Sequence, residues 1–318
     1  MKITVAGCGR WGTFIAWYLD HTGHEVTLYG RSTSENMKRL LSTRKNDYLE
    51  LTDTVKLSTE LSSLNEAEAV VISVGAQGLR ALCSQIAEFG VENKIFILCM
   101  KGLEIGTGCR LSEIASGVLH PSNRVAVWLG PGHVQEFYNG IPNCMVIDSD
   151  DEETKQYLVK ELSGGLIRFY FGTDMIGNEI GAAAKNVIGI AAGMLDGAGL
   201  SSLKGALMAR GAREIARLIK ALGGSELSAY GLCHLGDYEA TVFSKHSHNR
   251  KFGEAFIKGE KFTSLAEGYY TVKALMEMGG KYDVDLPICN VVYEILYNNQ
   301  NPADALESLF KRDTKSEF

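Results

Sequence analysis

Residues 2–12 read KITVAGCGRWG, a short apolar run followed directly by three glycines spaced as GxGxxG. A strand that leads through this spacing into a helical pattern is typical of a dinucleotide-binding βαβ unit. Gly7 permits the tight turn, Gly9 lets the backbone approach a pyrophosphate, and Gly12 allows close packing of helix on sheet. We therefore predict that this loop binds a nicotinamide dinucleotide. The open alternative is a glycine turn that binds nothing.

The end of the second apolar run bears on the type of cofactor. An acidic residue at this point binds the adenosine ribose of NAD, whereas an arginine suits the 2′-phosphate of NADP. The chain reads YGRS over 29–32, without an acid, and Arg10 in the glycine loop adds a second positive charge. A guanidinium can bind a phosphate through two parallel hydrogen bonds. We predict NADP or NAD as the cofactor, with NADPH favoured; the alternative that Arg31 is a solvated loop residue stays open.

The first half of the chain alternates short apolar runs with helical patterns. The runs are rich in Val and Ile, and several are apolar on both faces, as buried strands of a parallel sheet are. They are residues 2–7, 25–30, 69–74, 94–100, 124–130, 143–149 and 166–172. Helical segments such as 11–22 and 77–88 separate them, in the βαβ rhythm of a doubly wound sheet. We predict an α/β Rossmann-type domain over residues 1–174.

From about residue 176 the pattern changes to helices rich in Gly, Ala and Leu. Helices are expected over 177–195, 202–222, 264–279 and 287–298, and runs with a β pattern disappear. At 318 residues the chain exceeds the usual size of one hydrophobic core, so two domains are expected. We predict an all-α C-terminal domain over residues 175–318.

One stretch of this second half, residues 177–197, reads GNEIGAAAKNVIGIAAGMLDG. Five glycines and Lys185 recur in it at intervals of four, which places them on one strip of a helix. Glycine inside a helix costs roughly 0.5–1 kcal/mol relative to alanine, so close approach of backbone or ligand is the expected reason. Lys185, beside Asn186, is then a cation suited to a reacting carbonyl. The open alternative is a helix packed on another helix, with Lys185 extending to solvent.

Composition excludes several classes of function. The net charge of −6 and the pI near 5.7 argue against nucleic acid as a partner. No run of about 18 apolar residues is present to span a membrane. The N-terminus lacks the apolar core and cleavage site of a signal peptide. The seven cysteines show no CxxC spacing and no clustering with His, so we expect reduced thiols, no metal site and a cytoplasmic protein.

Further segments rich in glycine and charged residues follow expected strand ends or lie in the helical half. They are MKGLE at 100–104, GPGH at 130–133, LGD at 235–237 and SHNRKFG at 247–253. Together with the 177–197 stretch they match, in order and spacing, the landmarks GxGxWG, KGLE, GPxH, GAAxKNVIxIAAGMxDG, GLxxLGD and SxNRxFG. With these landmarks over nearly its whole length, the chain resembles the bacterial glycerol-3-phosphate dehydrogenase family.

The resemblance implies reduction of dihydroxyacetone phosphate to sn-glycerol 3-phosphate with NAD(P)H, for phospholipid synthesis, by a homodimer. It implies that Lys185 is the proton donor or acceptor and that Asn186 and Asp237 orient it as the rest of the catalytic group. The implied substrate contacts are Lys101, Gly130, Lys185, Asp237, Ser247, His248 and Asn249. The glycine loop, Arg31 and the resemblance together give the expected cofactor contacts, which are Gly7, Gly9, Arg10, Trp11, Gly12, Arg31, Lys101, Val134, Arg250 and Glu267.

The chain departs from the family pattern at two places where the substrate is expected. His248 stands where the phosphate loop usually has the first arginine of SRNR. Residues 231–238 read GLCHLGDY where the family pattern is GLAGLGDL. Arg250 and Lys251 are the nearest residues that would supply the positive charge missing at 248. These departures bear on the identity of the substrate more than on the type of reaction.

Two other interpretations stay open. A diverged paralogue of the same fold would act on another small phosphorylated or carboxylated carbonyl compound. A non-catalytic nucleotide sensor would keep the cofactor pocket without turnover, but such a protein would need none of Lys185, Asn186 and Asp237. An NAD(P)H oxidation assay against dihydroxyacetone phosphate and a panel of carbonyl compounds distinguishes the three.

Overall fold

The computed structural model describes residues 1–314, 316 and 317. The chain folds into two compact units. The first contains residues 1–101 and 109–179, and the second contains residues 102–108 and the chain from residue 180 onward. The first unit is an α/β sheet structure and the second is helical, which confirms the predicted fold class.

The first unit is built on one eight-stranded sheet in the order β3-β2-β1-β4-β5-β6-β7-β8. The strands are β1 Lys2–Ala6, β2 Glu25–Tyr29, β3 Lys56–Ser58, β4 Ala69–Ile72, β5 Ile95–Leu98, β6 Arg124–Leu129, β7 Asn143–Asp148 and β8 Ile167–Phe171. Each predicted run contains one strand; the three-residue β3 was missed because it is too short to show a pattern. The chain leaves the neighbours β1 and β4 toward opposite edges, which creates a ligand-binding crevice at their carboxyl ends.

The direction of β7 differs from the expected parallel sheet. β7 runs antiparallel to β6, with Trp128 opposite Ile147, whereas the other neighbouring pairs are parallel. An apolar run reports burial, which is the same for either direction. The five-residue helix α5 Val134–Tyr138 in the connection advances only about 8 Å. A return along the six-residue β6 would need about 20 Å, so the connection favours the antiparallel pairing.

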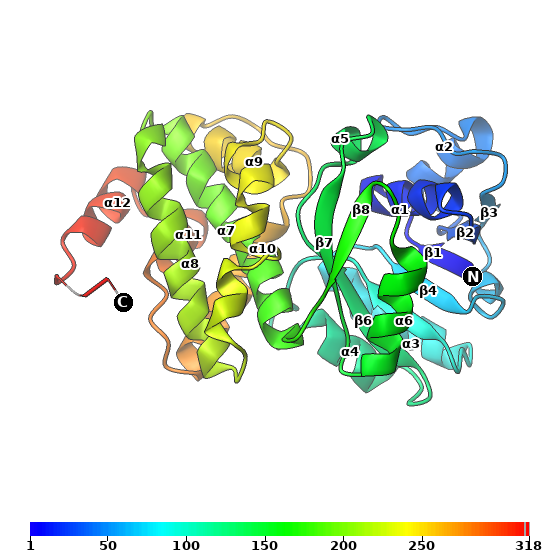
Figure 1. The fold of residues 1–318 in the computed structure, drawn as a ribbon. Helices are drawn as coiled ribbons and strands as arrows, with labels where there is room; N and C mark the ends of the chain where they lie inside the picture. Colours follow the sequence, from blue (N-terminus) through cyan, green and yellow to red (C-terminus); the bar gives the residue numbers. More distant parts are fainter. Residues whose placement is uncertain (315, 318) are drawn as a thin grey trace. The chain divides into compact units, whose positions relative to one another are not determined.

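Helices cover both faces of this sheet. They are α1 Arg10–His21, α2 Glu35–Thr43, α3 Leu79–Glu88, α4 Leu111–Val118, α5 and α6 Glu152–Leu162. Helices α1 and α2 lie on one side of the sheet and α3 and α4 on the other (Figure 1). The buried face of α1 includes Phe14 and Leu19, and the hydroxyl of Tyr18 donates to the carbonyl oxygen of Leu162, 2.7 Å away. This packing holds the middle of α1 against the neighbouring part of the first unit.

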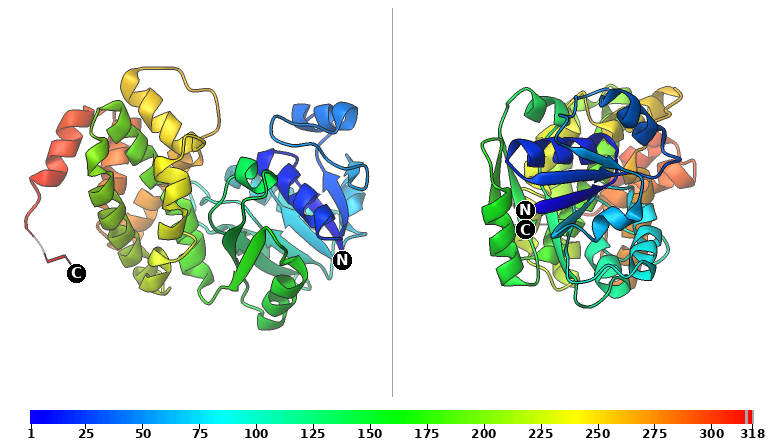
Figure 2. Two further views of the ribbon diagram at one scale, coloured as in Figure 1. Left: turned by 45° about the horizontal axis from the view of Figure 1, so that its top comes forward. Right: turned by 90° about the vertical axis from the view of Figure 1, so that its right-hand side faces the viewer.

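The second unit is a bundle without strands among its described residues (Figures 1 and 2). Its helices are α7 Met175–Gly197, which begins in the first unit, α8 Lys204–Ala221, α9 His248–Lys258, α10 Glu267–Lys281, α11 Pro287–Tyr297 and α12 Pro302–Phe310. Four of them match predicted helices, whereas α9 and α12 were not predicted. Over the described part of the chain, no helix combines the length and apolar character that a membrane crossing requires.

Two glycines of α7 are explained by the backbone of α9, which packs directly against them. A Cβ added to Gly193 would lie 1.9 Å from the carbonyl oxygen of Arg250, in α9. One added to Gly197 would lie 2.9 Å from the carbonyl oxygen of Glu254, one turn further along α9. The helix-packing alternative is therefore right for these glycines. It is wrong for Lys185, which is only 8% exposed and does not extend to solvent.

We predict that Gly193→Ala destabilises the protein by about 3 kcal/mol, because the added methyl would displace the backbone of α9. The matched control is Gly205→Ala in α8, where an added Cβ would meet no described atom within 4 Å. That variant is expected to be neutral or to gain up to about 1 kcal/mol from helix propensity. Urea unfolding followed by circular dichroism measures both. Equal effects of the two substitutions would contradict the packing role of Gly193.

Candidate active site

Two glycines of the loop at 7–12 are required by close packing. Gly7 has a φ of +126°, and a Cβ on it would lie 2.0 Å from the carbonyl oxygen of Ser73. A Cβ on Gly12 would lie 1.9 Å from the carbonyl oxygen of Gly7. These contacts hold the first turn of α1 against the ends of β1 and β4. The turn at Gly7 and the packing at Gly12 agree with the roles expected of the motif.

The space beside Gly9 fits a pyrophosphate. A Cβ on Gly9 would meet no described atom within 4 Å, and no side chain caps the first turn of α1. The unpaired N–H groups and positive dipole end of this 12-residue helix are therefore open to a ligand. A dinucleotide pyrophosphate needs both backbone donors and the absence of a side chain, and the loop supplies both.

Arg10 and Trp11, in the first turn of α1, lie beside the same space. The Arg10 guanidinium lies over the Tyr48 ring, 5.6 Å from its centroid. The Trp11 ring packs against Phe14 and Phe137, with centroid separations of 5.1 and 6.3 Å. Arg10 thus keeps a positive charge at the loop, while Trp11 anchors the turn in the aromatic part of the core.

Arg31 lies just beyond the carboxyl end of β2, next to the glycine loop. It follows Gly30, on which a Cβ would lie 2.6 Å from the Sγ of Cys8 in the loop. The Cys8 thiol also lies 3.4 Å from the Ser34 hydroxyl, which caps α2. The side chain of Arg31 is exposed. An exposed guanidinium at this point is accessible to a phosphate bound beside the loop.

Lys101 and Gly130 meet at the carboxyl ends of β5 and β6. The Lys101 ammonium donates a 2.6 Å hydrogen bond to the carbonyl oxygen of Gly130. Gly130 has a φ of +135°, and a Cβ on Gly132 would lie 2.2 Å from the Phe137 ring. Val134 then begins α5 and is buried. Because ligands of doubly wound sheets bind at this edge, Lys101 lies where a cation can face a bound molecule.

In the second unit, two side chains meet the ammonium group of Lys185. The Nζ of Lys185, on α7, lies 2.9 Å from Oδ2 of Asp237 and donates a 2.8 Å hydrogen bond to Oγ1 of Thr241. The Thr241 hydroxyl donates in turn to the carbonyl oxygen of Asp237, 2.7 Å away. Thr241 lies in a π-helical turn, Glu239–Phe243, which begins two residues after Asp237. Such turns are frequent at functional sites because they redirect side chains.

This triad of Lys185, Asp237 and Thr241 is almost closed to solvent. The exposed fractions are 8% for Lys185 and 1% for each of the other two residues. An isolated buried ion costs several kcal/mol, and a well-placed opposite charge with further hydrogen bonds offsets that cost. Asp237 supplies the opposite charge and Thr241 a neutral acceptor. Lys185 can therefore remain an ammonium inside the protein, held at a fixed position.

Asn186 and Asn249 tie three helices together beside the triad. The Asn249 amide nitrogen donates to the side-chain oxygen of Asn186 at 3.0 Å. The Asn249 side-chain oxygen accepts from the N–H of Gly268 at 2.9 Å. A Cβ on Gly268 would lie 2.6 Å from the carbonyl oxygen of Asn186. The structure thus brings α7, the start of α9 and the first turn of α10, which begins at Glu267, to one point.

The start of α9 carries the segment expected to bind phosphate. Ser247 caps this helix by accepting from the N–H of Arg250 at 3.3 Å. His248 is half-buried, and its ring meets that of Phe262 edge-on with a centroid separation of 6.4 Å. The N-terminus of an 11-residue helix is itself a source of positive potential.

The side chain of Arg250 is held by carboxylates. Its guanidinium lies 2.5 Å from Asp196 and 3.3 Å from Glu254, and it donates to the carbonyl oxygen of Ser244 at 3.2 Å. These two carboxylates reduce the positive charge that the sequence offered as a replacement for the missing arginine. They do not cancel it, because Asp196 also pairs with Lys204 and Glu254 with Lys258. Lys251, by contrast, is exposed.

Two buried residues of this region were not predicted from the sequence. Thr241 follows Asp237 by four residues, a spacing of one helical turn that would have indicated a shared face. His234, noted only as a departure from the family pattern, is fully buried between Gly181 and Tyr238. Burial lowers the pKa of His234 to about 4, against opposing effects of its hydrogen bond to Gly181 and of Asp237. Its imidazole is therefore neutral near pH 7.

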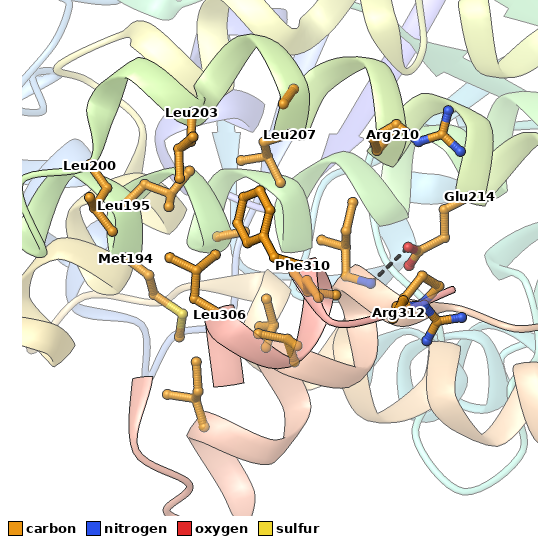
Figure 3. Close-up of a pocket in the computed structure, with 18 of the residues that line it drawn as sticks. Met194, Leu195, Leu200, Leu203, Leu207, Arg210, Glu214, Leu306, Phe310 and Arg312 are labelled. Carbon is orange, nitrogen blue, oxygen red and sulfur yellow. Dashed lines mark hydrogen bonds between the residues drawn. The ribbon is translucent and has the colours of Figure 1, made fainter. Parts of the chain in front are cut away.

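A separate cavity of about 1190 Å³ lies elsewhere in the second unit (Figure 3). Helices α7, α8, α11 and α12 line it with mostly apolar side chains, among them Leu207 and Phe310. At its wall the Glu214 carboxylate accepts from the N–H groups of Ile288 and Cys289, at 2.8 and 2.9 Å, and so caps α11. None of the proposed site residues lines this cavity.

Family models match both halves of the chain. The N-terminal model of NAD-dependent glycerol-3-phosphate dehydrogenase matches residues 2–155, and the C-terminal model matches residues 174–307. The chain belongs to the NAD-dependent glycerol-3-phosphate dehydrogenase family. Membership of this family confirms the resemblance inferred from the motifs. It also agrees with the dinucleotide predicted from the glycine loop.

Relatives in this family match the chain over its full length. It is 35% identical over 339 residues to the glycerol-3-phosphate dehydrogenase (NAD(P)+) of Prosthecochloris aestuarii, with 100% of both chains covered. It is 34% identical over 330 residues to that of Thermoanaerobacter sp., covering 100% of this chain and 99% of the relative. The crystal structure of glycerol-3-phosphate dehydrogenase from Coxiella burnetii has a TM-score of 0.91 at 27% identity, covering 98% of this chain and 99% of that one.

Proposed function

We propose that this chain acts as an NAD(P)-dependent glycerol-3-phosphate dehydrogenase, which reduces dihydroxyacetone phosphate to sn-glycerol 3-phosphate and catalyses the reverse reaction. The observation that carries the proposal is the buried ammonium of Lys185, held by Asp237 and Thr241 in a member of this dehydrogenase family. A protein that only senses a nucleotide has no need of such a group, and this argues against a non-catalytic role.

Lys185 is the proposed proton donor. A bound NAD(P)H would supply a hydride to C2 of the substrate, so that the carbonyl oxygen becomes an alkoxide. An alkoxide needs a cation beside it and then a proton. The Nζ of Lys185 supplies both, because its ammonium stabilises the developing charge and then transfers a proton to the oxygen. Asp237 and Thr241 fix the position of Nζ, so the proton comes from a defined point.

The substrate phosphate is proposed to bind at the start of α9. Ser247, His248 and Asn249 lie there, and the helix N-terminus offers backbone N–H groups and a positive dipole end. His248 adds a charge only when it is protonated. Arg250 adds long-range attraction that Asp196 and Glu254 reduce. Binding of the phosphate therefore depends on the helix terminus and on the protonation of one histidine.

We propose that residues 1–174 bind the dinucleotide and residues 175–318 the substrate. The glycine loop would hold the pyrophosphate, and Arg31 with Arg10 would favour the extra phosphate of NADPH; the open space beside Gly9 supports this assignment. Lys101 and Val134, at the same edge of the sheet, would contact the cofactor. Glu267, at the start of α10, is proposed as a further contact.

The biological setting is part of the same proposal. The family resemblance supports a homodimer, a role in phospholipid synthesis and a cytoplasmic location. The net charge of −6 supports a small molecule rather than nucleic acid as the partner.

A second candidate is a paralogue that reduces another small phosphorylated or carboxylated carbonyl compound. His248 favours it, because histidine is a weaker phosphate ligand than the arginine of the family pattern. Comparison of kcat/KM for dihydroxyacetone phosphate with a panel of carbonyl compounds tests the choice. A higher value for another compound would replace the proposed substrate but keep the reaction type.

We predict that the enzyme uses NADPH at least as well as NADH, because Arg31 is exposed and residues 30–34, directly after β2, contain no acid. Arg31→Ala should weaken the binding of NADPH much more than the binding of NADH. The matched control is Arg124→Ala, at the amino end of β6, which should leave the binding of both cofactors unchanged. Steady-state kinetics with both cofactors measures the effect. A preference of the parent for NADH above about tenfold, roughly 1.4 kcal/mol, would refute the role of Arg31.

Lys185→Ala should lower kcat by about 10²–10⁴-fold while leaving NADPH binding nearly intact, since a general acid is lost. The matched control is Lys204→Ala, which removes a second buried lysine of the same unit, ion-paired with Asp196 at 2.7 Å. The control should lose stability but little kcat. Stopped-flow turnover and fluorescence titration with NADPH measure the two quantities. A fall in kcat of less than about tenfold for Lys185→Ala would contradict its proposed role.

We predict that KM for dihydroxyacetone phosphate rises between pH 6 and 8. A histidine with its ordinary pKa, near 6.5, is mostly charged at pH 6 and neutral at pH 8, so a phosphate contact that needs this charge weakens across the range. His248→Arg should flatten the dependence and lower KM, and Arg250→Ala should raise KM. Initial rates over this pH range measure the change. If KM is independent of pH in the parent and unchanged in His248→Arg, His248 does not contribute to binding of the substrate phosphate.

A further inference from the structure

Two departures from the family pattern, at positions 234 and 238, form one buried contact. The Nε2 of His234 lies 2.8 Å from the Tyr238 hydroxyl, and its Nδ1 lies 2.8 Å from the carbonyl oxygen of Gly181. Both side chains are 0% exposed. A carbonyl oxygen can only accept, so Nδ1 of a neutral His234 carries the proton and Nε2 accepts from Tyr238. The two residues are therefore matched to one another in a single hydrogen-bond chain.

One end of this chain is attached to the turn of α7 that carries Lys185. In an α-helix the carbonyl oxygen of Gly181 accepts from the N–H of Lys185, four residues on. His234 donates to the same oxygen. A Cβ on Gly181 would lie 2.9 Å from the Cβ of His234, so only glycine lets the imidazole approach this closely.

The other end is attached to the segment that carries Asp237. His234 precedes Asp237 by three residues, and the N–H of Asp237 donates to the carbonyl oxygen of His234 at 3.0 Å. Tyr238 follows Asp237 directly, and a Cβ on Gly211 of α8 would lie 3.3 Å from the Tyr238 hydroxyl oxygen. The imidazole thus lies between the helix of the ammonium and the turn of its carboxylate partner.

We propose that His234 and Tyr238 are positioning residues that hold the carboxylate of Asp237 against the ammonium of Lys185. The contact joins the two segments by hydrogen bonds that bear no net charge, close to an ion pair whose geometry is sensitive to small shifts. The proposal rests on the proposed function, in which Lys185 delivers the proton. A displacement of about 1 Å at a reacting group can lower a rate by about 10²-fold.

The test compares His234→Leu, His234→Asn and Tyr238→Phe by steady-state kinetics and thermal unfolding. His234→Leu removes both hydrogen bonds at similar volume and should lower kcat by about 10–10²-fold, with KM for NADPH changed less than about twofold. His234→Asn keeps a donor near the position of Nδ1 and should recover kcat to within about threefold of the parent. The kcat of Tyr238→Phe should lie between those of the two His234 variants. The double variant His234→Leu/Tyr238→Phe should lose no more kcat than His234→Leu alone.

A merely structural role would give a different pattern. The matched control is Tyr18→Phe, which removes a buried 2.7 Å hydrogen bond to Leu162 in the first unit and should lower Tm without changing kcat. If His234→Leu and Tyr238→Phe also lower only Tm, or if His234→Asn is as slow as His234→Leu, the positioning proposal is overturned. If His234→Leu does not fold, His234→Asn and Tyr238→Phe still test the proposal. The proposal then requires that Tyr238→Phe lowers kcat more than Tyr18→Phe does. The proposed function fails separately, when Lys185→Ala keeps its activity.

Discussion

The second unit depends on the close approach of backbone to the glycine face of α7. Side chains at Gly193 and Gly197 would collide with the carbonyl oxygens of α9, and a side chain at Gly181 would displace His234. Because these positions are bare, α9 and the turn before Asp237 reach the helix directly. The same contacts bring Asp237 and Thr241 to Lys185. Packing and site assembly thus follow from one constraint, the absence of Cβ atoms along a helical strip.

The buried ion pair shows how this packing becomes chemistry. An ammonium that is 8% exposed is tolerated because a carboxylate 2.9 Å away compensates its charge. The surrounding hydrogen bonds involve neutral partners, namely Thr241 and the neutral imidazole of His234. Removing either member takes the opposite charge away from the other, so we expect such a variant to lose both stability and turnover.

The first unit supplies a different kind of site, made of backbone rather than side chains. The turn at Gly7 and the open space beside Gly9 place helix N–H groups where a pyrophosphate needs them. The proposed preference for NADPH rests instead on side chains, namely the exposed Arg31 and Arg10 over the Tyr48 ring. The glycine spacing is therefore recognisable from the sequence, whereas the proposed selectivity depends on only one or two side chains. A site made of backbone restricts the residue types at several positions of the loop, whereas a side chain that sets selectivity restricts the residue type at its own position only.

The sequence by itself determined the α/β and helical halves, the glycine turn and the candidacy of Lys185, because each follows from local spacing. It did not determine the antiparallel direction of β7, since an apolar run reports burial and not direction. It offered Arg250 as a free positive charge, and only the tertiary structure placed Asp196 and Glu254 against it. The burial of Lys185, its contact with Thr241 and the bond between His234 and Tyr238 were likewise decided by the fold. These contacts join residues distant in the chain or buried by other segments, and periodicity within a segment carries no information about its partner.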